Sequence, residues 1–478
     1  MNNHRISIGI VVFCWLMTAC AVGGEESDAA PLPSVRGSLP ETPRSAPTIT
    51  VLRRTDTPAP TPTPEHAAFS FRETLFGSAS PVALWIDAIE SDSGQVVLNG
   101  LAPGNPNGPF VVDWGDGTRD ESWFPMSHTY ADRGKNYIAA VTVKYSSGET
   151  YSAECLIRFA PLEIKKIPLP GNLAVSIPDS RQDLTARVYP APANLSYFDD
   201  GLMAGGVISR DDIEYVLSLS AYLQYDFANE DVFSAEDGFP QVVLLSPGLE
   251  GMYSLWFTTP ASFVSGEYGF RGMIQYSSFF HEMGHNVTLN SPAEYYYGGK
   301  IDGNANAIFS ETMANIFAHA TSQEILSDPA AYGLDEGLAF EIGQSAVSSL
   351  MVTRNAYEAY LGGGKPFRSW NDPGTPEDET FGTFMTIAFK FCEHAEDRGL
   401  GYREPLKRMM ELLQHFNVDW RSRYAQRMNT PEADAFRSTL MVAALSYAFS
   451  ADLRGEFRGL NFPIDNSAYQ ELIGSVSP

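Results

Sequence analysis

Two histidines four residues apart, with a glutamate beside the first, form the stretch of this chain best suited to chemistry. They are His281, Glu282 and His285, an H-E-x-x-H pattern. On a helix, residues at this spacing project from one face about one turn apart, so both imidazoles can bind the same metal ion. Glu282 then stands where it can take a proton from a water on that metal. The pattern predicts a catalytic zinc site; the alternative is an amphipathic helix that carries two histidines.

A catalytic zinc site needs a third protein ligand and one open position. Glu311 suits this role, because it lies 26 residues beyond His285 (311 − 285), far enough for the chain to turn and pack a second helix against the first. Asn315 falls on the same helical face, where its side-chain oxygen could accept the spare ring N–H of a zinc-bound histidine. We therefore predict two packed helices, one over 273–289 and one from about 306 onward. Apolar neighbours predict that Glu311 is buried: Phe309, Met313, Ile316 and Phe317.

The order H-E-x-x-H followed by E-x-x-A-N resembles the gluzincin metallopeptidases. The resemblance implies an α+β zincin fold in which Zn²⁺ is held by His281, His285 and Glu311. It also implies that Glu282 is the general base that activates water for attack on a peptide carbonyl. The metzincin alternative requires a histidine six residues after the second motif histidine, and Ser291 occupies that position.

Peptidases of this kind also use a tyrosine or histidine to stabilise the oxyanion. The sequence offers several candidates and does not assign the role to one of them. They are Tyr295, Tyr296, Tyr297, His319, Tyr402, His415 and Tyr447. For each of them a purely structural role is the alternative.

The last part of the chain is expected to be mainly helical, over 380–394, 402–415 and 430–448. Its 452–464 segment reads Asp-Leu, then Phe, then Asn-Phe-Pro-Ile. This ending resembles that of the enhancin-like, mucin-degrading branch of these peptidases, with Asn461 where the branch usually has glycine. The resemblance implies a helical C-terminal lobe and an enzyme that acts on glycoproteins.

Short β-type runs separated by Gly, Asn, Pro and Asp occupy residues 80–161 and predict a β-sandwich. Within them, 113–118 (Asp-Trp-Gly-Asp-Gly-Thr) and 127–130 (Ser-His-Thr-Tyr) resemble PKD domains, which are β-sandwiches often joined to secreted hydrolases. We expect His128 to be structural and the domain to act as a spacer or a weak binder of glycan or protein. The clearest predicted strands are 82–89, 95–101, 110–114, 137–145 and 150–159.

The N-terminus has the features of an export signal. A short basic start precedes an apolar run over 6–17 that is too short to span a bilayer. The run ends in Leu-Met-Thr-Ala-Cys, which resembles a bacterial lipobox and implies cleavage before Cys20 and lipid attachment to it. We therefore predict a lipoprotein signal peptide over 1–19, with plain secretion as the alternative.

Length and composition set the domain organisation. A chain of 478 residues exceeds one ordinary core. Pro and Thr dominate 20–75 and favour an extended, semi-rigid linker. The predicted order is signal peptide, linker, PKD-like sandwich over 80–161 and zinc metallopeptidase domain over 162–478. The net charge of −26, from 32 basic and 58 acidic residues, argues against nucleic acid as a partner.

Two cysteines, Cys155 and Cys392, lie beyond the first twenty residues. They are far apart in sequence and fall in different predicted domains. We expect two buried free thiols, with a disulfide between them as the alternative.

These patterns together predict a multidomain protein: an all-β PKD-like sandwich, then an α+β gluzincin-like zincin domain with a mainly helical C-terminal lobe. The expected function is an extracytoplasmic, lipid-anchored zinc endopeptidase that cleaves proteins or glycoproteins. Two alternatives remain open at this stage. One is a surface binding protein for glycan or protein on a peptidase-like scaffold, and the other is a zinc hydrolase of a non-peptide bond.

Overall fold

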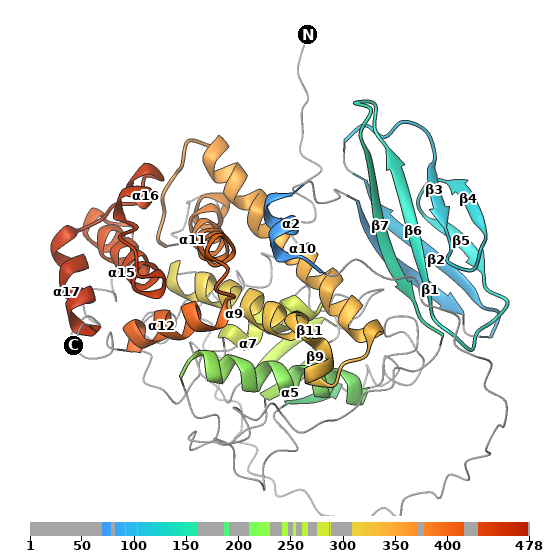
Figure 1. The fold of residues 1–478 in the computed structure, drawn as a ribbon, viewed down its shortest axis with the longest axis horizontal. Coiled ribbons are helices and arrows are strands. Elements are labelled where there is room, and N and C mark those ends of the chain that lie inside the picture. The colour runs from blue at the N-terminus through green and yellow to red at the C-terminus, as the bar shows by residue number, and fades with distance from the viewer. Residues whose placement is uncertain are drawn as a thin grey trace, which may run out of the picture.

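The structure is a computed structural model, and it combines a β-rich part with a mostly helical part (Figure 1). It describes residues 69–77, 82–90, 92–102, 104–159, 186–190, 210–229, 241–246, 252–254, 261–265, 275–285, 287, 308–370, 377–414 and 429–476. The predicted signal peptide, Cys20 and nearly all of the predicted linker lie outside these residues.

The β-rich part consists of two antiparallel sheets. One has the order β1 (Ala83–Glu90), β2 (Gln95–Leu101), β5 (Met126–Thr129). The other has the order β4 (Arg119–Ser122), β3 (Phe110–Asp113), β6 (Tyr137–Lys144), β7 (Thr150–Ile157). The prediction of an N-terminal β-sandwich is thus confirmed at the level of architecture, and β4 and β5 are two strands that the sequence pattern did not single out.

Alternation of side chains along the strands builds the sandwich core. In β6 every second residue points inward, from Tyr137 through Ala139 and Val141 to Val143, and all four are buried. Because successive strand side chains face opposite sides of a sheet, this period of two buries one face and leaves the other to solvent. Fully buried Trp114 completes the core, and its carbonyl oxygen accepts a hydrogen bond from the Tyr130 hydroxyl at 2.8 Å.

A small mixed sheet lies beside the helices. Its strands follow the order β10 (Met252–Ser254), β11 (Ala261–Ser265), β9 (Gln241–Ser246), β8 (Ala186–Pro190). Strands β8, β9 and β11 are parallel, and β10 pairs antiparallel with β11. Helix α5 (Arg210–Phe227) contacts β8, and the helix that carries the motif contacts β10 and β11.

The helical part has one continuous apolar core, in agreement with the mainly helical C-terminal lobe that the sequence predicted. The predicted helices over 380–394, 402–415 and 430–448 correspond to α11, α12 and α15. Besides α5, the described residues of this part form α7 (Tyr276–His285), α9 (Ile308–Ser327), the short 3₁₀ helix η4 (Pro329–Tyr332), α10 (Glu336–Gly362), α11 (Glu377–Arg398), α12 (Arg403–Gln414), α15 (Pro431–Phe449), α16 (Arg454–Gly459) and α17 (Asn466–Val476).

The segment just before the sandwich also belongs to the helical part. Helix α2 (Phe71–Phe76) starts at Ser70, whose hydroxyl accepts from Glu73 N at 3.2 Å. Its Phe71 and Leu75 are buried in the helical core, and α2 contacts α10 and α11 (Figure 1). The predicted linker over 20–75 therefore stops short of α2, because this apolar turn is folded. The sandwich is inserted between α2 and the rest of the helical part.

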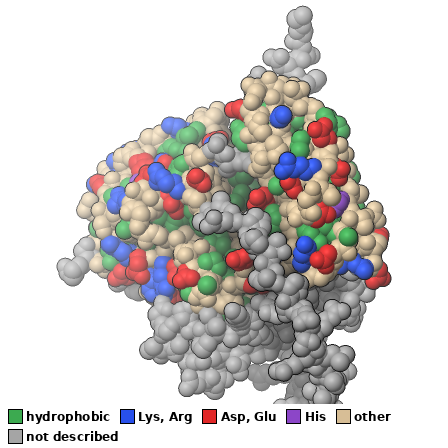
Figure 2. Space-filling view, turned by 45° about the vertical axis from the view of Figure 1, so that its right-hand side comes forward, with side chains coloured by type: hydrophobic (Ala, Val, Ile, Leu, Met, Phe, Trp, Pro, Cys, Tyr) green, Lys and Arg blue, Asp and Glu red, His purple; other side chains and the backbone are tan. Residues whose placement is uncertain are grey.

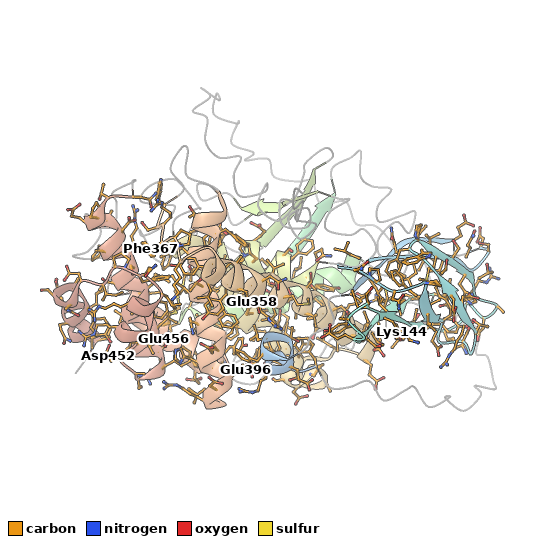
Figure 3. All side chains as sticks on the ribbon, turned by 90° about the horizontal axis from the view of Figure 1, so that it is seen from above. Lys144, Glu358, Phe367, Glu396, Asp452 and Glu456 are labelled. Carbon is orange, nitrogen blue, oxygen red and sulfur yellow. The ribbon has the colours of Figure 1, made fainter. Side chains whose placement is uncertain are left out.

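Seen from above, the sandwich and the helical part lie side by side. Lys144 of β6 lies on the sandwich side of the molecule, and Asp452 and Glu456 lie towards the opposite end (Figure 3). No helix in the described part of the chain is long and apolar enough to cross a bilayer. Both Cys155 and Cys392 are buried free thiols, as predicted.

Candidate metal centre

Helix α7 is positioned by polar contacts as well as by its apolar side. Phe279, Phe280 and Met283 are buried in the helical core. At the first turn, where backbone N–H groups lack helical partners, Ser277 N donates to the Ser345 hydroxyl of α10 at 2.8 Å. The carbonyl oxygen of Phe280, next to the first motif histidine, accepts from Gln224 Nε2 of α5 at 2.7 Å. These contacts set the position of α7 against its neighbours.

Helix α9 runs antiparallel to α7. The start of α7 meets the end of α9, since the hydroxyls of Ser277 and Ser322 are 3.5 Å apart, and His285 meets Ser310 at the opposite end. Gly284 permits this close packing. A Cβ at that position would lie 3.0 Å from Ala314 Cα, closer than most real Cβ contacts. The glycine inside the motif therefore lets the two helices approach.

The two helices bring together the three residues predicted as metal ligands. His281, His285 and Glu311, called the ligand triad below, offer donor atoms that all lie within 4.8 Å of one another. The two histidine Nε2 atoms are 3.1 Å apart, and their rings are nearly perpendicular at 89°. Glu311 places Oε2 at 3.4 Å from His281 Nε2 and Oε1 at 3.5 Å from His285 Nε2.

These separations fit one small divalent ion. Ligands about 2.0–2.1 Å from a tetrahedral metal stand roughly 3.3–3.4 Å from one another, and the three measured separations are 3.1, 3.4 and 3.5 Å. Two imidazoles and one carboxylate suit zinc and also other divalent transition metals. The triad therefore has the donor types and spacing of a metal site, without specifying the metal.

Two polar side chains lie next to the histidines. The Asn315 side chain helps to raise the pKa of His281, and its Nδ2 donates to the Glu311 carbonyl oxygen at 2.8 Å. The Ser310 hydroxyl lies 3.2 Å from His285 Nδ1, the ring nitrogen that faces away from the triad. When His285 Nδ1–H donates to the Ser310 oxygen, the ring tautomer is fixed and Nε2 keeps its lone pair for a metal.

Ser310 was missed by the sequence analysis. The one feature of the sequence that could have pointed to Ser310 is its position directly before Glu311, at the start of α9. A short polar side chain there would be an ordinary helix-start residue unless the partner helix is known to present His285 to it. The contact exists because α7 and α9 are antiparallel and close.

Charge and burial shift the histidine pKa values in opposite directions. Burial opposes the charged form of His281, but hydrogen bonds and charge from Glu311, with the Glu282 charge, raise its pKa above the usual value. Burial lowers the pKa of His285 to about 4, in spite of the Glu311 charge. Neutral His285 keeps a lone pair, as a metal ligand must.

Glu282 lies on α7 beside His281 and is 3% exposed. It is not among the three residues whose donor atoms converge. A carboxylate held out of bulk solvent, one residue from a ligand, can receive a proton from a group bound at the triad. Glu282 thus follows His281 in the helix and stands outside the group of three converging residues.

The remaining candidates for oxyanion stabilisation fall into two groups. His319 of α9 is buried, and its Nε2 lies 2.9 Å from the Thr353 hydroxyl. Burial lowers the pKa of His319 to about 3. Tyr402 is buried beside the rings of Phe71 and Phe391, and the Tyr447 hydroxyl donates to Glu411 at 3.0 Å. These contacts favour structural roles. Four candidates, Tyr295, Tyr296, Tyr297 and His415, lie outside the described residues.

His128 lies in the sandwich, away from the helices of the triad. Its ring stacks on Trp114, with centroids 4.7 Å apart, and its Nε2 lies 2.8 Å from Asp116 Oδ2.

Comparison of the chain with known protein families, curated proteins and solved structures gives no match. What the site can do must therefore be argued from its own residues.

Proposed function

We propose that the chain is a zinc-dependent endopeptidase that acts outside the cytoplasm on proteins or glycoproteins. The observation that carries the proposal is the convergence of His281, His285 and Glu311, with Glu282 beside the first ligand. A chance pair of histidines on an amphipathic helix would not require a carboxylate from a second helix at tetrahedral spacing. The resemblance of H-E-x-x-H and E-x-x-A-N to gluzincin peptidases adds support for peptide hydrolysis.

In this proposal the triad holds the zinc ion, and Ser310 and Asn315 orient the two imidazoles. When bound, zinc supplies Lewis acidity and brings the pKa of a water ligand towards neutrality. The Glu282 carboxylate takes the proton of the attacking water and passes it to the amide nitrogen that leaves. Strand β10 is the last strand in the described order of its sheet and contacts α7, so in this proposal it pairs with an extended peptide.

The finer family features also belong to the proposal. The two-sheet sandwich is compatible with a PKD-like domain, and the helical lobe is compatible with an enhancin-like peptidase. We further propose export and lipid attachment at Cys20, which would hold the mature protein on the outer side of a bacterial membrane. On the face drawn in Figure 2, Lys and Arg side chains are interspersed with Asp and Glu, which suits a protein rather than a nucleic acid partner.

The decisive experiment uses protein lacking the residues before Phe69, so that α2 is kept. It should contain about one zinc per chain and cleave a mucin-type glycoprotein or its deglycosylated form. Glu282→Gln should retain the metal and lose nearly all cleavage, because only the base is removed. The matched control is Glu358→Gln, an exposed glutamate of α10 labelled in Figure 3, which should cleave as the unchanged protein does.

The possible results separate the alternatives. Protein that holds no zinc contradicts the whole proposal. Protein that holds zinc but cleaves neither substrate form supports a binding protein or a hydrolase of another bond. Cleavage of only the glycosylated form would identify the glycan as part of the recognised substrate.

A further inference from the structure

A buried ion pair joins the sandwich to the helical part. Arg158, directly after β7, contacts the carboxylate of Glu341 in α10, and the two side chains are 1% and 7% exposed. Taking both charges out of water is costly, so such a pair persists only where the surrounding structure holds both partners in place. Cys155 of β7 and Phe340 of α10 line a small hollow at the same junction. The sandwich is therefore docked on α10 at this point.

The segment that precedes the sandwich contacts the same helix. Gly77, at the end of α2, offers its carbonyl oxygen to Arg354 Nη1 at 2.8 Å. Phe69, just before α2, lies 3.5 Å from the position that a Cβ on Gly343 would take. The segment before the sandwich and the residue after its last strand thus both contact α10.

Helix α10 also holds the helices of the ligand triad. Ser345, one turn beyond Glu341, accepts the hydrogen bond from Ser277 N at the start of α7. Two turns further on, Thr353 bonds His319 of α9, which lies close enough to His281 for the charges to affect each other. Helices move largely as rigid elements, so a displacement of α10 at Glu341 should also displace Ser345. The start of α7, which is hydrogen-bonded to Ser345, would then shift with it.

We propose that the docked sandwich positions the metal centre: Arg158, acting through Glu341 and α10, holds α7 where its two histidines meet Glu311. Arg158 is a positioning residue and touches neither metal nor substrate. The inference rests on the proposed function only for the identity of the metal. The mutual placement of α7 and α9 can be measured without zinc and without any cleavage.

The test is hydrogen exchange of backbone amides in the metal-free full chain. Arg158→Met keeps the length of the side chain and removes its charge, leaving the Glu341 carboxylate buried beside an apolar group. Exchange over 276–285 should become at least about tenfold faster, while α15, on the far side of α9, keeps its protection. The control is Arg119→Met, which removes an exposed ion pair with Asp113 in the same sandwich and should change neither region.

A double variant distinguishes loss of the ion pair from general misfolding. Arg158→Met combined with Glu341→Leu replaces the ion pair by apolar packing, which commonly preserves a buried contact. Protection over 276–285 should return towards that of the unchanged protein, and zinc affinity, lowered about tenfold in the single variant, should recover with it. Two results would overturn the inference: faster exchange in β7 with no change in α7, or equally faster exchange throughout the helical part.

Discussion

Two clusters in the described helices pair histidine with glutamate, and they differ in which groups face the carboxylate. In the ligand triad, Glu311 faces two imidazole Nε2 atoms at 3.4 and 3.5 Å. In the second cluster, called the lysine cluster, Lys390 Nζ lies 2.9 Å from Glu456 Oε1, and His394 Nε2 lies 3.0 Å from Glu456 Oε2. Glu393 also belongs to the lysine cluster, 2.5 Å from Lys390 Nζ.

The difference shows how the fold distinguishes a metal site from an ion-pair network. In the lysine cluster the ammonium group satisfies the carboxylates, so burial is outweighed by hydrogen bonds from His394 and Lys390 that lower the pKa of Glu456 to about 2. In the triad, two nitrogen atoms 3.1 Å apart both point towards the carboxylate. Such an arrangement suits a divalent cation among the three donors, which supplies the charge that a lysine supplies in the other cluster.

The largest expected effect separates the two clusters by metal content. His285→Ala removes one of three ligands and should reduce bound zinc from about one per chain to nearly none at micromolar free metal. His394→Ala should keep full metal content, because the carboxylates of the lysine cluster are paired with Lys390. Metal analysis after dialysis checks both variants. Equal metal loss in the two would remove the distinction between the clusters.

The next effect concerns the distance between α7 and α9, which sets the geometry of the ligand triad and does not affect the lysine cluster. Gly284→Ala places a Cβ against Ala314 and Phe317 of α9 and should destabilise the fold by about 1–3 kcal/mol through overpacking. Next to Glu456 of the lysine cluster, the Cβ added by Gly455→Ala meets nothing within 4 Å, so this change should be neutral or stabilising by up to about 1 kcal/mol. Urea denaturation measures both. A neutral Gly284→Ala would show that α7 and α9 need not approach so closely.

A smaller effect is expected from the residue that orients His285. Ser310→Ala removes the hydroxyl near Nδ1, so the ring tautomer is no longer fixed, and zinc should bind about tenfold more weakly. Ser310→Thr keeps a hydroxyl and should restore most of the affinity. Competition with a chromophoric chelator measures the constants. Unchanged affinity in Ser310→Ala would mean that the contact does not support metal binding.

The smallest effect is the pH response of the lysine cluster. The folded-state pKa of Glu456 is about 2, below its ordinary value of 4.5, so its contribution to stability is present above pH 4.5 and is lost as pH falls towards 2. Glu456→Gln should cost about 1 kcal/mol at pH 7, allowing for partial solvent exposure, and progressively less towards pH 3. Urea denaturation across this range checks the trend. A cost that does not change with pH would assign the loss to packing.

Local patterns predicted a large part of the fold. Alternation along β6 and the other strands indicated the sandwich, and apolar periodicity placed α11, α12 and α15 close to their observed bounds. Helix α2 was missed, because a six-residue helix beside a proline-rich stretch has little periodicity of its own. It is stable through contacts with α10 and α11, which are hundreds of residues away in sequence.

What the sequence by itself determined is the set of donor types and their spacing along each helix. The four-residue spacing of His281 and His285 is a property of helical geometry, and it needs no tertiary contact to put both rings on one face. Glu311 could be chosen for its type, its apolar neighbours and its distance along the chain.

Only the tertiary structure decided that the three donors converge. The antiparallel packing of α7 on α9, permitted by Gly284, sets the distances of 3.1 to 3.5 Å and brings Ser310 to His285. The docking of Arg158 on Glu341 was equally invisible, since its partners come from different domains. Contacts between remote segments depend on how whole elements pack, and no local pattern specifies that packing.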